Sequence, residues 1–193
     1  MTSRLEPLLT VADLEAFPDD DGNRYEVIEG ELFVSCSPGL THQIVSDNII
    51  YLMRSYLDKN PIGIVVSTIG LILSEYSGVI PDIVFFKRES TARIVTGERL
   101  TSAPEIVIEI LSPGTENIRR DRVAKLQLYE KHGVLEYWIV DREKQVIEIY
   151  RLLDTKLKPF GVFTDGDYLT TPILPGFSCS ASELFILPSL FKT

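Results

Sequence analysis

The chain has 193 residues, of which 45% are hydrophobic and 24% charged, and its formal net charge is −9 at pH 7. This length suits one domain with one substantial core, and the composition is ordinary for a soluble globular protein. No stretch approaches the ~20 consecutive apolar residues of a membrane span. The N-terminus lacks the apolar core of a signal peptide, so we expect a cytoplasmic protein. The acidic balance argues against broad, non-specific binding to nucleic acid, because neutralising phosphates requires Lys and Arg.

The first part of the chain predicts a short helix, a hairpin and a long helix. The short helix spans about 10–18 and begins at a threonine that can cap it. Two apolar segments, 25–28 and 32–34, flank the Glu-Gly-Glu turn at 29–31, which predicts an N-terminal β-hairpin whose glycine can adopt a positive φ. Over 41–57 the apolar residues recur at spacings of three and four, the pattern of a long amphipathic helix.

The second part of the chain alternates strands with one helix. Strands are predicted for six segments: 62–68, 70–74, 82–86, 105–111, 135–140 and 146–150. The segment 105–111 is apolar on both faces, as a central strand should be. A helix over about 116–132 follows it and ends at Gly133, so that 105–140 predicts one parallel strand–helix–strand crossover. We therefore expect a single α/β domain over 1–193, with its core at about 10–180 and a mixed central sheet flanked by helices.

Glu109 is a carboxylate inside the strand predicted to be buried on both faces. Its neighbours Ile108 and Ile110 are apolar. An unpaired buried carboxylate is costly or takes up a proton. Such a residue persists if it pairs with a cation, is protonated or lies at the open end of its strand. Its place near the C-terminal end of the strand favours the last of these, since α/β sheets bind ligands there.

Asp82 opens another predicted strand, directly after Pro81. Alone, it is more simply interpreted as a capping aspartate, because Pro-Asp is common turn chemistry. Together with Glu109 it has a second interpretation. Two carboxylates on neighbouring strands can share a hard divalent cation, which binds through oxygen ligands.

The helix after Glu109 adds a third element. Asp121, Lys125 and Tyr129 are spaced four apart and so lie on one helical face. One interpretation of Asp121 and Lys125 is a surface ion pair, which contributes little to stability. The other has Lys125 reaching back over the end of the sheet towards Glu109. The segment 117–132 carries five basic and two acidic residues, so charge is segregated along the chain, although a helix this basic is most often simply solvated.

Several common catalytic and metal-binding patterns are absent from the sequence. It has no HxH, HExxH or Cys/His cluster, which argues against a zinc hydrolase. It also has no GxSxG, GxxxxGK[ST] or GxGxxG motif. His42, near the start of the long helix, is expected to be a neutral capping or surface residue.

Five segments, in this order, carry a family resemblance: 24–32, 81–84, 103–113, 125–129 and 136–141. They resemble the bacterial family of putative restriction endonucleases often called Uma, which belongs to the PD-(D/E)XK nuclease superfamily. The resemblance covers roughly residues 10 to 180. It implies a restriction-endonuclease-like core, with Asp82 as the first metal carboxylate and Glu109 as the second.

The resemblance also implies roles for other residues. The superfamily has a lysine two positions after the second carboxylate, where this chain has Leu111; in this family the lysine is replaced from the following helix, at the position of Lys125. Glu26 resembles an additional acidic residue of the superfamily, and Asp121 and Tyr129 are further candidates. We expect removal of Lys125 to abolish cleavage while leaving folding nearly intact.

The implied activity is Mg²⁺-dependent (or Mn²⁺-dependent) hydrolysis of DNA phosphodiester bonds. Arg119, Arg120 and Arg122 would hold the flanking nucleic-acid backbone. Nucleases that cut duplexes usually act in pairs, so we expect a homodimer, with the hairpin turn and the apolar tail at 184–191 as contact surfaces. The alternative is a catalytically degenerate nuclease fold that serves as a binding or interaction module, which the acidic net charge and Leu111 favour.

Overall fold

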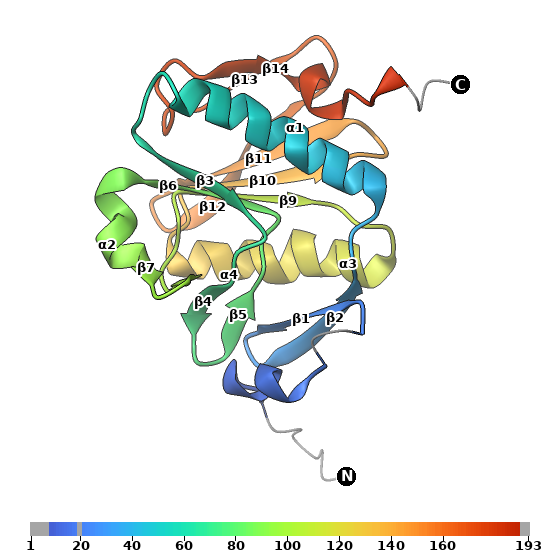
Figure 1. Ribbon diagram of the computed structural model, residues 1–193, viewed down its shortest axis with the longest axis vertical. Coiled ribbons are helices and arrows are strands. Elements are labelled where there is room, and N and C mark those ends of the chain that lie inside the picture. The colour runs from blue at the N-terminus through green and yellow to red at the C-terminus, as the bar shows by residue number, and fades with distance from the viewer. Residues whose placement is uncertain (1–7, 19–20, 190–193) are drawn as a thin grey trace.

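The computed structural model describes residues 8–18 and 21–189, and its largest element is a six-stranded sheet (Figure 1). Its spatial order is β12-β11-β10-β9-β6-β3. The strands span, in chain order, β3 (Gly63–Ser67), β6 (Ile83–Lys87), β9 (Ile106–Ile110), β10 (Glu136–Asp141), β11 (Val146–Leu153) and β12 (Lys156–Phe163). β9 and β10 are parallel, whereas the other neighbours are antiparallel. The predicted mixed α/β sheet is confirmed.

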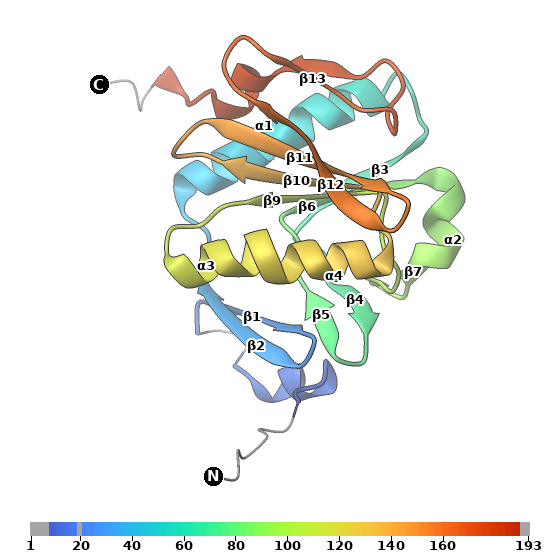
Figure 2. The ribbon, with the colours of Figure 1, turned by 180° about the vertical axis from the view of Figure 1, so that it is seen from behind.

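Helices cover both faces of this sheet, as Figure 2 shows from behind. α1 (Leu40–Leu57) lies on one face. On the other lies the crossover between β9 and β10, which consists of α3 (Thr115–Arg119), a π-helical segment η3 (Arg120–Ala124) and α4 (Lys125–His132). The crossover ends at Gly133, whose φ of 79° is the left-handed conformation that glycine adopts readily. Within the described residues no helix is long and apolar enough to cross a membrane.

Alternation along the central strands divides the core into two layers. In β9, Ile106, Ile108 and Ile110 pack towards α1. Val107 and Leu111 pack instead with Leu128 and Tyr129 on the side of α4. Because successive side chains of a strand point to opposite faces, Glu109 belongs to the α4 side. An otherwise apolar strand therefore holds one carboxylate, that of Glu109, against the crossover helix.

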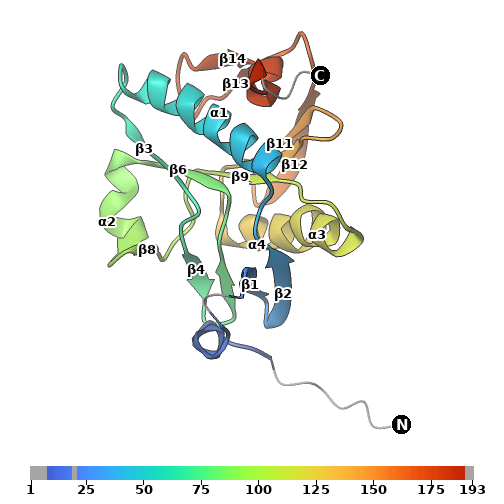
Figure 3. The same cartoon turned by 45° about the vertical axis from the view of Figure 1, so that its right-hand side comes forward.

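A second, smaller sheet lies beyond α3 and α4 and contains the predicted hairpin (Figure 3). Its order is β2-β1-β5-β4-β8-β7. The strands span β1 (Asn23–Ile28), β2 (Glu31–Cys36), β4 (Leu71–Ser74), β5 (Ser77–Val79), β7 (Val95–Thr96) and β8 (Arg99–Leu100). Glu29 and Gly30 form the two-residue turn of the hairpin with φ values of 51° and 83°, as this tight connection requires. The sheet brings β1 and β5 against the crossover.

The remaining elements are short. The expected helix at 10–18 is only a 3₁₀ turn, η1 (Ala12–Ala16), preceded by hydrogen bonds from Thr10 to the Asp13 carboxylate. η2 (Arg88–Ser90) and α2 (Thr91–Ile94) follow β6. β13 (Tyr168–Thr170), β14 (Ser178–Ser180) and η4 (Ala181–Phe185) pack on the α1 side.

The apolar tail differs from the expectation that it forms a contact surface. Leu184 is 1% exposed and belongs to the core beside α1, so it is not available to a partner. Ile186 is 57% exposed. Residues 190–193, and with them Leu190 and Phe191, lie outside the described residues.

Candidate active site

The two expected metal carboxylates lie opposite each other on adjacent strands. β6 and β9 are antiparallel, with Ile83 opposite Ile108. Extending this register by one residue sets Asp82 opposite Glu109, and opposed residues share a face of the sheet. Asp82 Oδ2 accepts a hydrogen bond of 2.8 Å from the backbone N–H of Ile110. Both side chains are buried, at 7% and 1% exposure.

Lys125 lies at the centre of the site, not on the surface. Its Nζ is 2.8 Å from Glu26 Oε1, 2.9 Å from Glu109 Oε1 and 3.9 Å from Asp121 Oδ1. Tyr129 donates a hydrogen bond of 2.8 Å to the same Glu109 oxygen. The interpretation of Asp121 and Lys125 as a surface ion pair is therefore wrong, because both side chains are buried. The alternative, in which Lys125 reaches Glu109, describes the structure.

The π-helical segment η3 explains why Arg120, Asp121 and Lys125 all face the interior. A π-turn adds a residue to the helical turn and so shifts which side chains face inward. Here Arg120 and Asp121, neighbours in sequence, are both buried. The Arg120 guanidinium folds onto the Asp121 carboxylate, with Nε–Oδ1 at 2.8 Å and Nη2–Oδ2 at 3.1 Å. Lys125 is the first residue after η3 and enters the site beside this pair.

Glu26 joins the site from the hairpin. Its Oε1 accepts hydrogen bonds from the backbone N–H of Ile80, at 2.7 Å, and from Lys125. Its Oε2 lies 3.6 Å from Arg120 Nε and is buried, with no hydrogen-bond partner among the described residues. Glu26 is 1% exposed and points into the cluster.

The carboxylates outnumber the cations in this buried cluster, and their pKa values reflect it. Burial, with the negative charges of Asp82, Asp121 and Glu26, raises the pKa of Glu109 to about 8 despite the opposing effect of Lys125. Burial would also raise the pKa of Glu26, but Lys125 and Arg120 outweigh it and hold this pKa below its ordinary value. Burial would lower the pKa of Lys125, but Glu109 and Glu26 more than compensate and raise it. Lys125 is accordingly an ammonium at neutral pH.

Two residues that the sequence did not assign to the site hold Asp82. His42, in the first turn of α1, has its Nε2 3.2 Å from Asp82 Oδ2 and 3.0 Å from the carbonyl oxygen of Ile110. Arg24, on β1, has its Nη1 3.3 Å from Asp82 Oδ1. Burial would raise the pKa of Asp82, but the hydrogen bond from His42 and its charge lower it.

The expectation of a capping or surface role for His42 is wrong, because the ring is 4% exposed and faces Asp82. Nothing local in the sequence signals this contact, which α1 makes across the end of the sheet. Arg24 could have been found: it is two residues from Glu26 on one strand, and alternate residues share a face.

The three arginines expected to bind nucleic acid have different environments. Arg120 is 7% exposed and bound to Asp121, so its assignment as a backbone-binding residue is corrected. Arg122 makes two hydrogen bonds to the Glu148 carboxylate, at 2.8 and 2.5 Å. Arg119 is the most accessible of the three and pairs with Glu31 and Glu116.

The same burial argues against the expectation that folding would survive the loss of Lys125. Removing one partner of a buried ionic network leaves uncompensated charge and typically costs about 3–5 kcal/mol. Glu26, Glu109 and Asp121 would lose their shared cation.

The oxygens of the site that could bind a metal ion are those of the Asp82 and Glu109 carboxylates and of the Ile110 carbonyl. Asp82 Oδ2 and the Ile110 carbonyl oxygen lie close together, since His42 Nε2 is within 3.2 Å of both, and Glu109 lies opposite Asp82. Over residues 8–18 and 21–189, no three His, Cys, Asp or Glu side chains are grouped as a set of metal ligands.

Comparison with known proteins identifies the family. The family model described as Uma2, putative restriction endonuclease, matches residues 11–182. The chain belongs to the Uma2 family. No curated protein was found to match it.

Among solved structures, this Uma2 chain is similar to a putative nuclease belonging to DUF820 from Anabaena variabilis. The two share 20% sequence identity and superpose with a TM-score of 0.72, over 92% of this chain and 97% of the other. At this identity the likeness establishes a common fold. The expected restriction-endonuclease-like architecture is confirmed.

Proposed function

We propose that this Uma2 protein is a Mg²⁺-dependent endonuclease that hydrolyses phosphodiester bonds in DNA. The observation that carries the proposal is the position of Lys125, whose ammonium lies 2.9 Å from Glu109 Oε1 although Leu111 occupies the usual lysine position. A helix thus supplies the cation that the strand lacks. Family membership and the fold of the Anabaena variabilis nuclease support the same activity.

The donor set fits magnesium. Mg²⁺ usually keeps several waters and binds through one or two carboxylates together with substrate phosphates. Asp82, Glu109 and the Ile110 carbonyl offer that kind of set, and the buried, unpartnered Glu26 Oε2 is a further acceptor nearby. When bound, the ion would activate water and neutralise charge on the phosphate.

The protein residues have distinct tasks in this mechanism. Lys125 is held as an ammonium by Glu26 and Glu109, so it stabilises the negative charge that develops on the phosphate rather than accepting a proton. Tyr129 and Glu26 fix the positions of Glu109 and Lys125 respectively. His42 and Arg24 orient Asp82.

The test is a cleavage assay on supercoiled and linear DNA with and without Mg²⁺. We expect Asp82→Ala to abolish cleavage, and Asp47→Ala, which removes an exposed carboxylate of α1, to cleave at the wild-type rate. Mg²⁺-independent cleavage, or equal rates for wild type and Asp82→Ala, would overturn the proposal.

The same contacts also favour a second candidate, a binding module that has lost catalysis. The Arg24 guanidinium already pairs with Asp82, and His42 contacts the same carboxylate, as happens in a purely structural ionic cluster. Under this candidate the wild-type protein binds DNA but shows no cleavage in Mg²⁺ or Mn²⁺, and Asp82→Ala changes stability alone.

We also propose a homodimer, because cutting both strands of a duplex calls for two active sites and isologous pairs are the commonest oligomers. The hairpin turn is one contact surface, and exposed Ile186 another. Sedimentation velocity across micromolar concentrations tests this: a single monomeric species throughout would contradict it.

A further inference from the structure

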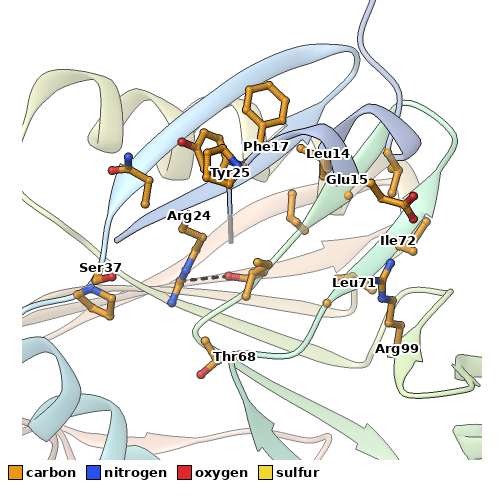
Figure 4. A pocket seen from close by; sticks show the side chains of 18 residues that line it. Leu14, Glu15, Phe17, Arg24, Tyr25, Ser37, Thr68, Leu71, Ile72 and Arg99 are labelled. Carbon is orange, nitrogen blue, oxygen red and sulfur yellow. Dashed lines mark hydrogen bonds between the residues drawn. The ribbon is translucent and has the colours of Figure 1, made fainter. Parts of the chain in front are cut away.

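A cavity of about 550 Å³ lies beside the candidate active site (Figure 4). Its walls come from η1 and the following turn, from β1, and from β4, β5 and β8. The volume falls within the ~300–1,000 Å³ of small-molecule sites and exceeds the space of a single base. None of its lining residues belongs to the carboxylate and lysine cluster described above.

The cavity and the active site share a wall. Arg24 lines the cavity, and its Nη1 is 3.3 Å from Asp82 Oδ1 and 3.4 Å from the carbonyl oxygen of Ile80. Ile80, also in the lining, donates its backbone N–H to Glu26 Oε1. Thr68 donates its N–H to the carbonyl oxygen of Asp82, at 3.1 Å. A molecule in the cavity therefore lies next to Arg24, which is in direct contact with the expected metal carboxylate Asp82.

The lining combines aromatic, apolar and cationic surfaces. The rings of Phe17 and Tyr25 stack on each other with centroids 4.6 Å apart, and Leu71 contributes apolar surface. Guanidinium groups come from two different walls, Arg24 on β1 and exposed Arg99 on β8 (Figure 4).

Arginines outnumber carboxylates among the described residues of the lining. Glu15 is the one carboxylate there, against Arg24 and Arg99, and Arg24 is already paired with Asp82 behind the wall. The chain as a whole carries −9. An anionic ligand therefore meets less negative charge in this cavity than over the average surface of the protein.

We propose that this cavity receives a nucleotide of the substrate DNA strand next to the scissile phosphate. Its base stacks on the Phe17–Tyr25 pair, and its phosphates lie near Arg24 and Arg99. Aromatic faces with interleaved cations are how proteins hold unpaired nucleotides with little sequence preference. The inference rests on the proposed function, since the nucleotide in the cavity belongs to the same DNA strand that the active site would cut.

The proposal predicts that the strand is unpaired where it enters the cavity, because a paired base cannot reach an aromatic platform inside a protein. The probe is a fluorescein-labelled single-stranded thymidine 12-mer, and binding is measured by anisotropy in EDTA, so that cleavage plays no part. We expect Phe17→Ala to weaken binding roughly tenfold, which is the typical cost of losing one stacking partner. Phe17→Leu, which keeps apolar bulk for folding, should weaken it similarly.

Arg99→Ala should weaken binding at low salt and reduce the slope of log affinity against log salt by about one, as expected for loss of one phosphate contact. The matched controls are Tyr51→Ala, an exposed aromatic on α1, and Arg93→Ala, an exposed arginine of α2 outside the lining. Both should bind as wild type.

Photo-crosslinking locates the strand directly. A 12-mer with one 5-iodouracil should crosslink in EDTA to a peptide that contains Phe17 or Tyr25. Absence of 12-mer binding by the wild type, wild-type affinity in both Phe17→Ala and Arg99→Ala, or crosslinks only outside the cavity lining would overturn the inference. Crosslinking without Mg²⁺-dependent cleavage would instead overturn the proposed function and leave this binding site in place.

Discussion

Glu109 lies on the α4 side of β9 between Val107 and Leu111, both of which pack in the apolar layer. Its carboxylate is nevertheless 1% exposed, and Lys125 and Tyr129 both approach Oε1. Three further carboxylates, those of Asp82, Asp121 and Glu26, raise its pKa together with burial. The pKa of Glu109 is thus raised well above its ordinary value, and its titration is open to measurement.

Wild-type stability should depend on pH through Glu109. Its pKa is raised from 4.5 to about 8 on folding, so the folded state binds this proton more tightly than the unfolded state. The resulting stability is fully present below about pH 4.5 and is lost as pH rises through about 8. We expect the free energy of unfolding of wild type minus that of Glu109→Gln, from urea titrations at pH 5 to 9, to fall with pH. A difference that stays flat across this window would contradict the raised pKa.

Lys125→Ala should both abolish cleavage and destabilise the fold by about 3–5 kcal/mol, because Glu26 and Glu109 lose a buried cation within 2.9 Å. Lys125→Met separates the two effects, since it keeps the packing of the stem and removes only the charge. The control is Lys131→Ala, whose partner Glu29 is exposed and whose loss should change urea stability little. Cleavage by Lys125→Met at the wild-type rate would contradict the role of the ammonium.

At the scale of residues, the sequence predicted the central residues of the site but not all of the residues that hold them in place. Glu109 and Lys125 could be found because a charge within an apolar strand, followed by a helical face of the right spacing, is a local pattern. His42 reaches Asp82 from an element 40 residues earlier in the chain, and such contacts follow from packing that no local pattern encodes. Arg120 was misassigned because its charge suggested solvent.

At the scale of elements, the helix predicted over about 116–132 is present but not regular. The apolar periodicity gives its extent and its end at Gly133, yet the π-helical segment η3 interrupts it. Ionic contacts account for this: Arg120 and Asp121 are both buried beside Glu26, and the pattern of apolar residues carries no information about them.

The η3 segment gives a matched pair of variants. Arg120→Ala should lower the free energy of unfolding by about 3–5 kcal/mol, since it leaves the buried Asp121 carboxylate without its two hydrogen bonds. Arg119→Ala removes the same group one residue earlier, from an exposed pair with Glu31, and should change stability little. Equal effects of the two variants in urea denaturation would show that the η3 cluster does not hold the crossover.

Strand length explains in part which strands were foreseen. The exception is β12, which has eight residues but was not predicted, because it contains Pro159 and Gly161 and buries only Leu157. The hairpin and the five-residue strands of the central sheet were predicted, because alternation or a continuous apolar run is visible over that length. β5, β7 and β8 were not, since segments of two or three residues show no periodicity. Their pairing depends on the chain around them, and β5 and β8 contribute residues to the lining of the cavity.

At the scale of the whole molecule, the site collects residues between 24 and 129 from β1, α1, the start of β6, β9 and the crossover helix. The family resemblance named Asp82, Glu109, Lys125 and Glu26 as one site, but it did not include Arg24 or His42. Composition alone would have argued against any polyanion as ligand. The net charge of −9 remains compatible with DNA binding because charge is distributed unevenly, as the two arginines that line the cavity beside Asp82 illustrate.

Magnesium should stabilise the whole protein if Asp82 and Glu109 bind it, because a ligand that binds only the folded state adds RT ln(1 + [L]/Kd). At a concentration ten times Kd this is about 1.4 kcal/mol. For a chain of this size it corresponds to a rise in Tm of roughly 3–6 °C. Differential scanning calorimetry in 10 mM MgCl₂ measures the shift, and Asp82→Ala should lose it.

The net charge makes the control essential. Divalent cations also screen the self-repulsion of a chain with charge −9, and that effect raises Tm without any site. It is present equally in Asp82→Ala and is matched by NaCl of the same ionic strength. The quantity that tests the site is therefore the Mg²⁺-induced shift in Tm of wild type minus the same shift of the variant. The Tm values themselves cannot be compared directly, because Asp82→Ala also leaves Arg24 and His42 without their partner. Equal shifts in the two proteins would mean that magnesium acts on the surface charge, and the metal assignment of Asp82 would then be withdrawn.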